Sequence, residues 1–195
     1  MLKQWKGALA ASVLGGLCVV MSGCAEKQGE MNMDAMTPPA RPAELDRLDA
    51  MVGNWEGTFE MKMAGSDQVM KGKGTSTIGW EAGKWILVER GEYTMGDKGD
   101  KMQMLGLWMY DAESKSYSTF WGDNGGGLEH GRATYDEATH TWNVKSSGDS
   151  PMFGKSRSEA TVKMVDKNTM EWKGTVWNSW KTKKLSEMTG TSKRK

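Results

Sequence analysis

Cys24 has the clearest chemical role of any residue in the sequence, because the segment before it has the composition of a secretory signal peptide. Lys3 and Lys6 give this segment a positive start, and residues 7–21 form an uncharged, mostly apolar run. Such a run is too short to span a bilayer with margin, and small residues stand just before the cysteine, where a signal peptidase cuts. We therefore expect residues 1–23 to be a signal peptide that is removed.

The sequence Val20-Met21-Ser22-Gly23-Cys24 resembles the lipobox of bacterial lipoproteins. This resemblance implies that Cys24 is diacylated, freed by cleavage at its amino side and then N-acylated, with palmitate among the attached chains. Several acyl chains on one residue anchor a protein stably, since each buried methylene contributes about 0.8 kcal/mol. Ala25 stands where an aspartate would resemble the inner-membrane retention signal of enteric bacteria. The expected location is the periplasmic side of the outer membrane, and the inner membrane is less favoured.

The mature chain carries no strong charge and no expected disulfide. Cys18 lies in the removed segment and Cys24 is expected to carry lipid, so no cysteine pair remains. Loss of Lys3 and Lys6 leaves 24 basic side chains against 25 acidic ones, a formal charge of −1. The only polybasic block is residues 193–195, which argues against a nucleic-acid partner.

The sequence contains none of the usual catalytic or cofactor-binding motifs. It has no Gly-x-Ser-x-Gly, no His-Glu-x-x-His, no phosphate-binding Gly-Lys-Ser/Thr loop and no dinucleotide fingerprint. The charged clusters considered for catalysis inside expected strands are Glu89-Arg90 and Glu129-His130 with Arg132, which suit a solvated face or cross-strand ion pairs. We expect no catalytic residues, no metal site and no cofactor.

Residues 24–41 are expected to be a flexible tether between the lipid and the folded domain. They are rich in polar residues and proline and contain no aromatic side chain, so they cannot bury enough apolar surface to offset ordering. Met31, Met33 and Met36 have the spacing of thioether clusters that bind Cu(I). Methionine is abundant throughout, with 17 residues, so copper binding stays an open alternative to simple composition.

The rest of the chain, residues 42–195, has the pattern of one all-β domain. Pro42 and the three-residue spacing of Leu45, Leu48 and Met51 predict one short helix. After Gly53 the apolar period changes to two, as in a half-buried strand. Nine further strands are expected at about 69–81, 84–95, 101–110, 115–122, 128–135, 140–147, 155–165, 169–177 and 180–191. About ten consecutive antiparallel strands close most readily into an up-and-down barrel.

One hairpin can be predicted in more detail. A four-residue turn at residues 136–139 would place Tyr135 opposite His140, Ala133 opposite Trp142 and Gly131 opposite Val144. The same register puts the following side chains on the solvated face: His130, Arg132, Thr134, Thr141, Asn143 and Lys145. The two histidines then point away from each other and cannot share a metal.

The segment Gly53-Asn54-Trp55, after a short helix, resembles the opening of the calycin superfamily, which includes lipocalins and fatty-acid-binding proteins. In lipocalins a basic residue from near the end of the barrel packs on this tryptophan, a role that Arg194 or Lys183 could fill here. The wider pattern is similar to a family of uncharacterised bacterial proteins, through residues 52–57, 106–111, 121–123 and 131–139. This resemblance implies a calycin-like barrel and no known activity. Nitrobindins, a neighbouring haem-binding group, differ from this chain, which has Phe59 at their last glycine and no histidine after His140.

Nine tryptophans remain after signal removal and suggest either a crowded core or a lined cavity. The candidate ligand-binding residues are Trp55, Phe59, Trp85, Tyr93, Trp108 and Trp121. The inward face of strands 84–95 and 101–110 stays open, because Ile86 and Val88, and Leu105 and Leu107, compete for it. We expect the barrel to bind a small hydrophobic or amphipathic molecule. The alternative is an envelope scaffold that binds protein and has a filled barrel. The oligomeric state stays undetermined.

Overall fold

The computed structural model describes residues 39–96, 99 and 101–195 of the chain. The expected signal peptide, the lipidation site Cys24 and the cluster of Met31, Met33 and Met36 lie outside these residues. Within the described part, no helix is long and apolar enough to cross a membrane.

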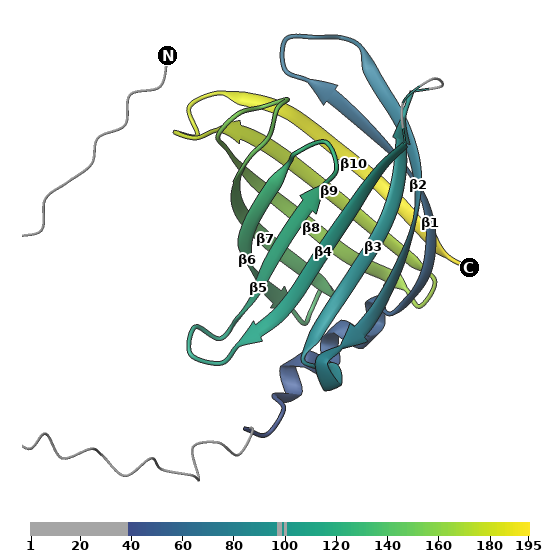
Figure 1. Ribbon diagram of the computed structural model, residues 1–195, viewed down its shortest axis with the longest axis vertical. Helices are drawn as coiled ribbons and strands as arrows, with labels where there is room; N and C mark the ends of the chain where they lie inside the picture. Colours follow the sequence, from purple (N-terminus) through teal and green to yellow (C-terminus); the bar gives the residue numbers. More distant parts are fainter. Residues whose placement is uncertain (1–38, 97–98, 100) are drawn as a thin grey trace, which may run out of the picture. The chain divides into compact units, whose positions relative to one another are not determined.

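Ten antiparallel strands form a closed barrel, in which neighbours in sequence pair with each other and β10 pairs with β1 (Figure 1). The strands are β1 (Gly53–Met63), β2 (Val69–Glu81), β3 (Ile86–Met95), β4 (Lys101–Asp111), β5 (Ser116–Asp123), β6 (Leu128–Asp136), β7 (Thr141–Asp149), β8 (Ser156–Asp166), β9 (Thr169–Asn178) and β10 (Lys184–Arg194). A short 3-10 helix, η2 (Ala43–Met51), precedes β1, and a 3-10 turn, η3 (Ala82–Lys84), joins β2 to β3. The predicted all-β up-and-down barrel with one short N-terminal helix is confirmed.

Side chains alternate between the interior and the exterior of the barrel, as the period of two predicts. In β1, Trp55 and Met61 are buried, whereas Glu56 and Glu60 are exposed. The pairing register also settles the two strands whose alternation was ambiguous. Leu87 pairs with Trp108 and both are buried in the core, so Ile86, Val88, Leu105 and Leu107 lie on the opposite, outer face.

The hairpin between β6 and β7 corrects one prediction. Asp136 pairs with Thr141, so the turn comprises residues 137–140 and lies one residue later than expected. Tyr135 therefore faces Trp142, not His140, while Ala133 faces Val144 and Gly131 faces Ser146. The error shifts the register by two residues and leaves the paired side chains on their predicted faces, whereas His140, expected in the strand opposite Tyr135, lies exposed in the turn. His140 lies in this turn, where it adopts a positive φ of 52° and its Nδ1 lies 3.0 Å from the Tyr135 hydroxyl.

The last strand begins four residues later than predicted. The Asn178 side chain accepts hydrogen bonds from the backbone N–H groups of Thr182 and Lys183, at 2.8 and 3.1 Å. These bonds hold the segment after β9 in a turn, because an asparagine side chain can replace a backbone partner there. Trp180 consequently lies in this turn and is 83% exposed.

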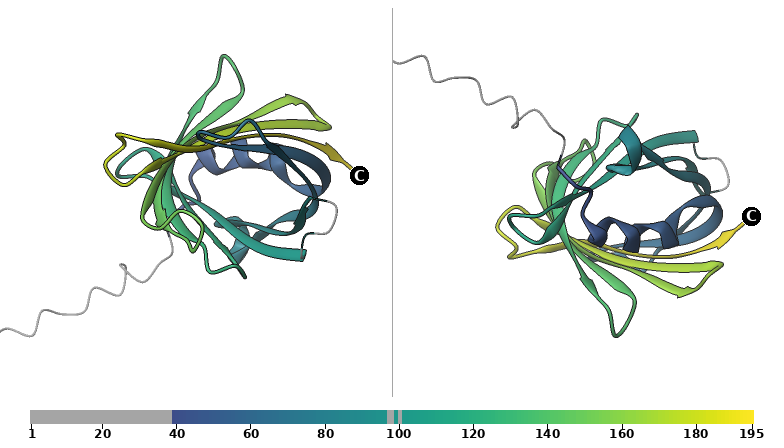
Figure 2. Two further views of the ribbon diagram at one scale, coloured as in Figure 1. Left: turned by 90° about the horizontal axis from the view of Figure 1, so that it is seen from above. Right: turned by 90° about the horizontal axis from the view of Figure 1, so that it is seen from below.

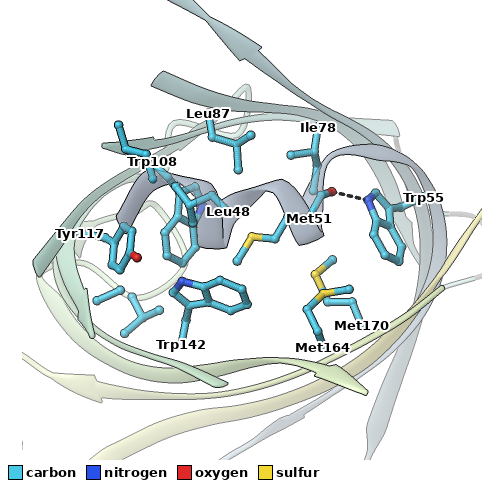
Figure 3. Close-up of a cluster of buried hydrophobic side chains, with 13 residues drawn as sticks. Leu48, Met51, Trp55, Ile78, Leu87, Trp108, Tyr117, Trp142, Met164 and Met170 are labelled. Atoms are coloured by element: carbon cyan, nitrogen blue, oxygen red, sulfur yellow. Dashed lines mark hydrogen bonds between the residues drawn. The ribbon is translucent and has the colours of Figure 1, made fainter. Parts of the chain in front are cut away.

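Helix η2 closes one end of the barrel, the lower end in Figure 1 (Figure 2). Leu45, Leu48 and Met51 follow each other at intervals of three, and this spacing puts them on one side of a 3-10 helix, which has three residues per turn. All three are buried and belong to one core with inward side chains of the strands, as Figure 3 shows for Leu48 and Met51. The resulting core contains, besides these three, Trp55, Ile78, Leu87, Trp108, Tyr117, Ala133, Trp142, Val144, Met164 and Met170.

Arg194, near the end of β10, ties the closed end together. Its guanidinium lies 4.3 Å from the centre of the Trp55 ring and donates hydrogen bonds to the carbonyl oxygens of Val52 and, at 2.8 Å, Ala50. The Trp55 indole in turn donates to the Met51 carbonyl at 2.8 Å (Figure 3). Of the two basic residues considered for this position, Arg194 occupies it, whereas Lys183 lies in the turn before β10 at the other end of the barrel.

We expect Arg194→Ala to lower the free energy of unfolding by about 2–3 kcal/mol, measured by urea denaturation. The substitution leaves two carbonyls at the end of η2 without their donor and removes the stacking on Trp55. Lys173→Ala, at an exposed outward position of β9, is the matched control and should change stability by less than about 0.5 kcal/mol. Equal effects of the two substitutions would contradict a role of Arg194 in closing the barrel.

Candidate ligand-binding site

The interior of the barrel differs in its two halves. Near η2 the inward side chains are buried in the core, but in the half farther from η2 many inward side chains keep part of their surface exposed. Because these side chains point into the barrel by their register, their exposed surface faces the interior. This inner surface, which we call the open half, is lined by large apolar residues: Phe59, Met63, Met70, Tyr93, Met95, Met102, Met104, Trp121, Trp172 and Met188.

Phe59 is the centre of an aromatic group in the open half. Its ring lies 5.9 Å from that of Tyr93, edge to face, and 5.9 Å from that of Trp172. Phe59 pairs with Gly72 on one side and with Gly190 on the other. A Cβ at Gly72 would clash with the Phe59 ring, and a Cβ at Gly190 would clash with the Trp172 ring. Glycine at these two positions lets the aromatic rings lie against the wall of the barrel.

Trp121 is a second aromatic element of the open half. It pairs with Gly106, where a Cβ would come within 2.4 Å of the indole, so the ring lies across this glycine toward β3. Its other edge meets Trp108 at a ring distance of 6.3 Å and an angle of 86°. Trp121 therefore stands at the boundary between the core and the open half, with part of its surface exposed.

The six candidate residues do not form one group. Phe59, Tyr93 and Trp121 line the open half, as described above. Trp55 and Trp108, exposed by only 1% and 2%, belong to the closed core, and Trp85 follows η3 and packs against the outside of this core. Alternation in the sequence gave the inward direction of a side chain but not its depth in the barrel.

Three carboxyl groups also point inward, and sequence reasoning missed them as site residues. Glu89 pairs with Ile78 and Gly106, Asp123 with Met104, and Glu129 with Trp121. Strand alternation could have identified the two glutamates, because neighbouring residues of a strand point to opposite faces. Glu129 precedes the outward His130, and Glu89 precedes the outward Arg90. The expectation of a solvated face or ion pairs is wrong for both glutamates and holds for their neighbours Arg90, His130 and Arg132.

Burial raises the pKa of Glu89, and a hydrogen bond with Ser76 lowers it in part. The residue keeps some accessible surface, but it points into the barrel, where an ionised carboxyl is poorly solvated. Tyr93 also has a raised pKa, first through burial and second through the negative charge of Asp123. The interior of the open half therefore has an acidic electrostatic character.

The outer groups considered for chemistry are structural. His130 is exposed on the outside of β6, and Arg132 donates hydrogen bonds at 3.0 and 2.9 Å to Asp111 and Ser116. Hydrogen bonds from Ser114 and then from Arg132 lower the pKa of Asp111 to about 2. These contacts fix the turn between β4 and β5 and present no nucleophile or paired acid and base.

A groove of about 920 Å³ lies along β1–β5 and the start of β6. Outward residues line most of it, including Thr75, Thr77, Gln103 and Leu105, and a smaller number of inner-face residues, such as Gly91 and Met104, also border it. Leu105 and Leu128 in this groove are exposed by 39% and 54%.

The described residues thus define a ten-stranded up-and-down β-barrel domain with one closed end and a partly exposed, apolar and acidic interior. A family model described as "Protein of unknown function (DUF1579)" matches residues 41–194, and the chain belongs to this family. The predicted resemblance to a family of uncharacterised proteins is therefore confirmed.

Solved structures are similar to this chain at low sequence identity. The crystal structure of Rv2717c from M. tuberculosis matches 80% of this chain and 99% of that chain, with 12% identity and a TM-score of 0.63. A redesigned beta barrel, mFAP0, bound to DFHBI, has 13% identity over 74% of this chain and 99% of that chain, with a TM-score of 0.40. A protein of unknown function from the DUF3598 family of Nostoc punctiforme PCC 73102 has 9% identity over 76% of this chain and 49% of that chain, with a TM-score of 0.39. A comparison with curated proteins found no match.

The interior position of Glu89 gives a prediction about pH. Its folded-state pKa is raised above the value of 4.5 for an exposed glutamate, so the folded protein binds more protons than the unfolded chain between these two pKa values. Stability should therefore fall as the pH rises above about 4.5, and Glu89→Gln should be more stable than the wild type at pH 7–8 by roughly 1 kcal/mol.

Thermal unfolding of both proteins between pH 4 and pH 8 measures this difference, which should vanish near pH 4. Glu92→Gln is the control on the same strand, because Glu92 faces outward and Lys101 and Gln103 hold its pKa low. A stability difference for Glu89→Gln that is independent of pH would show that the carboxyl is not destabilised by burial.

Proposed function

We propose that this protein is a lipid-anchored lipoprotein that faces the periplasm and binds a small hydrophobic or amphipathic molecule inside its barrel. The observation that carries the proposal is the open half, where aromatic and methionine side chains point inward and keep part of their surface exposed. Ligand sites in proteins are commonly concave and apolar with a few polar groups, which matches this lining. Binding without catalysis is the activity that this lining supports.

The lining is suited to hydrocarbon ligands of variable shape. Six of its ten large residues are methionines, whose unbranched side chains adapt to irregular surfaces. The aromatic group around Phe59 offers flat contact surfaces next to them. A barrel of this strand number can hold one small ligand when side chains do not fill it.

The anchor in this proposal rests on the sequence alone. The lipobox-like segment before Cys24 supports acylation, and Ala25 favours the outer membrane over the inner membrane. The proposed partners are the bilayer, through the acylated cysteine, and the small ligand.

A second candidate function is a scaffold that binds another protein. The outer groove across β1–β5 favours it, because Leu105 and Leu128 there expose apolar surface that the barrel does not use. In this function the open half would bind nothing, and the outer face of the sheet would be the working surface.

The neutral fluorescent hydrophobe N-phenyl-1-naphthylamine tests for binding in the barrel. It should bind saturably and raise the melting temperature, since it binds only the folded state. Trp121→Ala should weaken binding five- to tenfold, and Trp180→Ala, at a tryptophan exposed by 83% in a turn, should change it less than twofold. Circular dichroism melting of each variant checks that it is folded.

Absence of saturable binding would overturn the barrel-binding function. The scaffold would be favoured if cross-linking to a partner protein in cells were lost in Leu105→Arg and kept in Trp121→Ala. The opposite result, loss of N-phenyl-1-naphthylamine binding with Leu105→Arg and not with Trp121→Ala, would place the hydrophobic site on the outer groove.

Replacement of Cys24 by serine tests the anchor, because without the thiol no diacylglyceryl group can be attached. The wild-type protein should incorporate labelled palmitate and sediment with outer-membrane vesicles, whereas Cys24→Ser should incorporate none and leave the membrane fraction. Cys18→Ser, in the segment expected to be removed, is the matched control. Failure of the wild-type protein to take up palmitate would refute the anchor, and sedimentation with inner-membrane vesicles would refute the expected location.

A further inference from the structure

Charged side chains are distributed unequally between the two faces of the barrel. By the pairing register, Glu89, Asp123 and Glu129 point inward in the open half. Arg194, at the closed end, is the one basic side chain on the inner face among the described strand residues, whereas lysines of the same strands point outward. No ion pair joins any of the three inward carboxyls to a basic group within the described part of the chain.

Two of these carboxyls flank Trp121. Glu89 pairs with Gly106, Gly106 with Trp121, and Trp121 with Glu129, so the four residues form one row across β3, β4, β5 and β6. Neighbouring strands lie about 4.8 Å apart, which puts Glu129 one strand and Glu89 two strands from the tryptophan. The indole lies across Gly106 and therefore extends toward Glu89.

A buried hydroxyl without a partner lies next to this row. Thr119 points inward from β5, two residues before Trp121, and is 3% exposed. Its Oγ1 has no hydrogen-bond partner among the described residues. A buried polar group without a partner costs free energy, so a ligand group that bonds to this oxygen would recover part of that cost. By contrast, Glu129 accepts a hydrogen bond from Ser146 at 2.8 Å, which orients its carboxyl.

A third inward carboxyl, that of Asp123, lies toward the open end of the barrel. Asp123 lies at the end of β5, and its charge reaches Tyr93 across the inner surface. Its carboxyl accepts hydrogen bonds from the N–H groups of Gly125 and Gly127, at 2.9 and 3.0 Å, so the turn holds it in place. Negative groups in a space with low-dielectric walls concentrate cations there.

An anionic headgroup would find no counterpart in this interior. The guanidinium of Arg194 is already used by the carbonyls of Ala50 and Val52 and by the Trp55 ring. Carboxylates such as those of fatty acids would instead lie near Glu89, Asp123 and Glu129, and like charges within a few ångströms repel strongly in a poorly solvated site.

We propose that the ligand of the barrel is an amphipathic organic cation, whose charged head lies against Trp121 between Glu89 and Glu129 and whose apolar tail contacts Phe59 and the methionines. This inference rests on the proposed function and specifies its ligand class. An indole face attracts a cation, carboxylates attract it further, and the Thr119 oxygen is an acceptor for a donor on the headgroup. The methionine-rich wall imposes no fixed shape on the tail.

Three probes with the same ten-carbon chain test the charge preference: decyltrimethylammonium, decanoate and 1-decanol. Each displaces N-phenyl-1-naphthylamine from the full-length protein at pH 7.5, at concentrations below micelle formation or the solubility limit. The cation should bind at least tenfold more tightly than decanoate. Glu129→Gln and Glu89→Gln should each weaken binding of the cation three- to tenfold and leave 1-decanol within twofold.

Glu56→Gln and Glu60→Gln, at exposed outward positions of β1, are the matched controls and should leave all three affinities unchanged. This inference would be overturned if decanoate bound as tightly as the cation, or if neither inward substitution changed the affinity for the cation. Binding of 1-decanol in that case would still support the proposed function. If neither N-phenyl-1-naphthylamine nor 1-decanol binds, the proposed function fails and the ligand class fails with it.

Discussion

The contact of Arg194 with Trp55 and the end of η2 is the interaction on which the rest of the barrel depends. It joins the last strand to the first strand at the seam where the sheet closes. The same guanidinium donates hydrogen bonds to two carbonyls at the end of η2. Carbonyls at the end of a helix have no donor within the helix and need one from elsewhere. One side chain thereby fixes both the closure of the sheet and the position of the helix that covers its lower end.

Closure at one end makes the two halves of the interior chemically different. Tryptophans at the closed end, such as Trp55 and Trp108, give their surface to the core and have no contact with solvent. Tryptophans farther along the same inner face, such as Trp121 and Trp172, keep exposed surface. Tryptophans near η2 therefore stabilise the fold, whereas those farther from η2 keep surface that the proposed ligand could contact.

Periodicity in the sequence was sufficient to predict the fold, because alternation and three-residue spacing are direct geometric consequences of strands and of a 3-10 helix. Strand order followed from short connections, and the error at residues 136–140 arose from the exact length of one turn. The candidate site could be predicted only in part. Alternation places Trp55, Phe59 and Trp121 on the inner face, whereas the face of Trp108 follows only from the pairing register, and depth along the barrel depends on which end η2 covers. Inward glutamates were missed because a carboxyl in a strand usually faces solvent.

The inward carboxyls are difficult to explain by stability. Glu89 lies where burial opposes its ionised form, and an apolar residue of similar size would pack against Ile78 and Gly106 without that cost. Groups that reduce stability and cluster in a concave site are more often part of a function than of a scaffold. The methionines and aromatic rings can hold an apolar tail but cannot orient it, since dispersion contacts have little direction. In the proposed complex, the carboxyls of Glu89 and Glu129 supply the missing direction, because they determine where a charged or hydrogen-bonding head would lie.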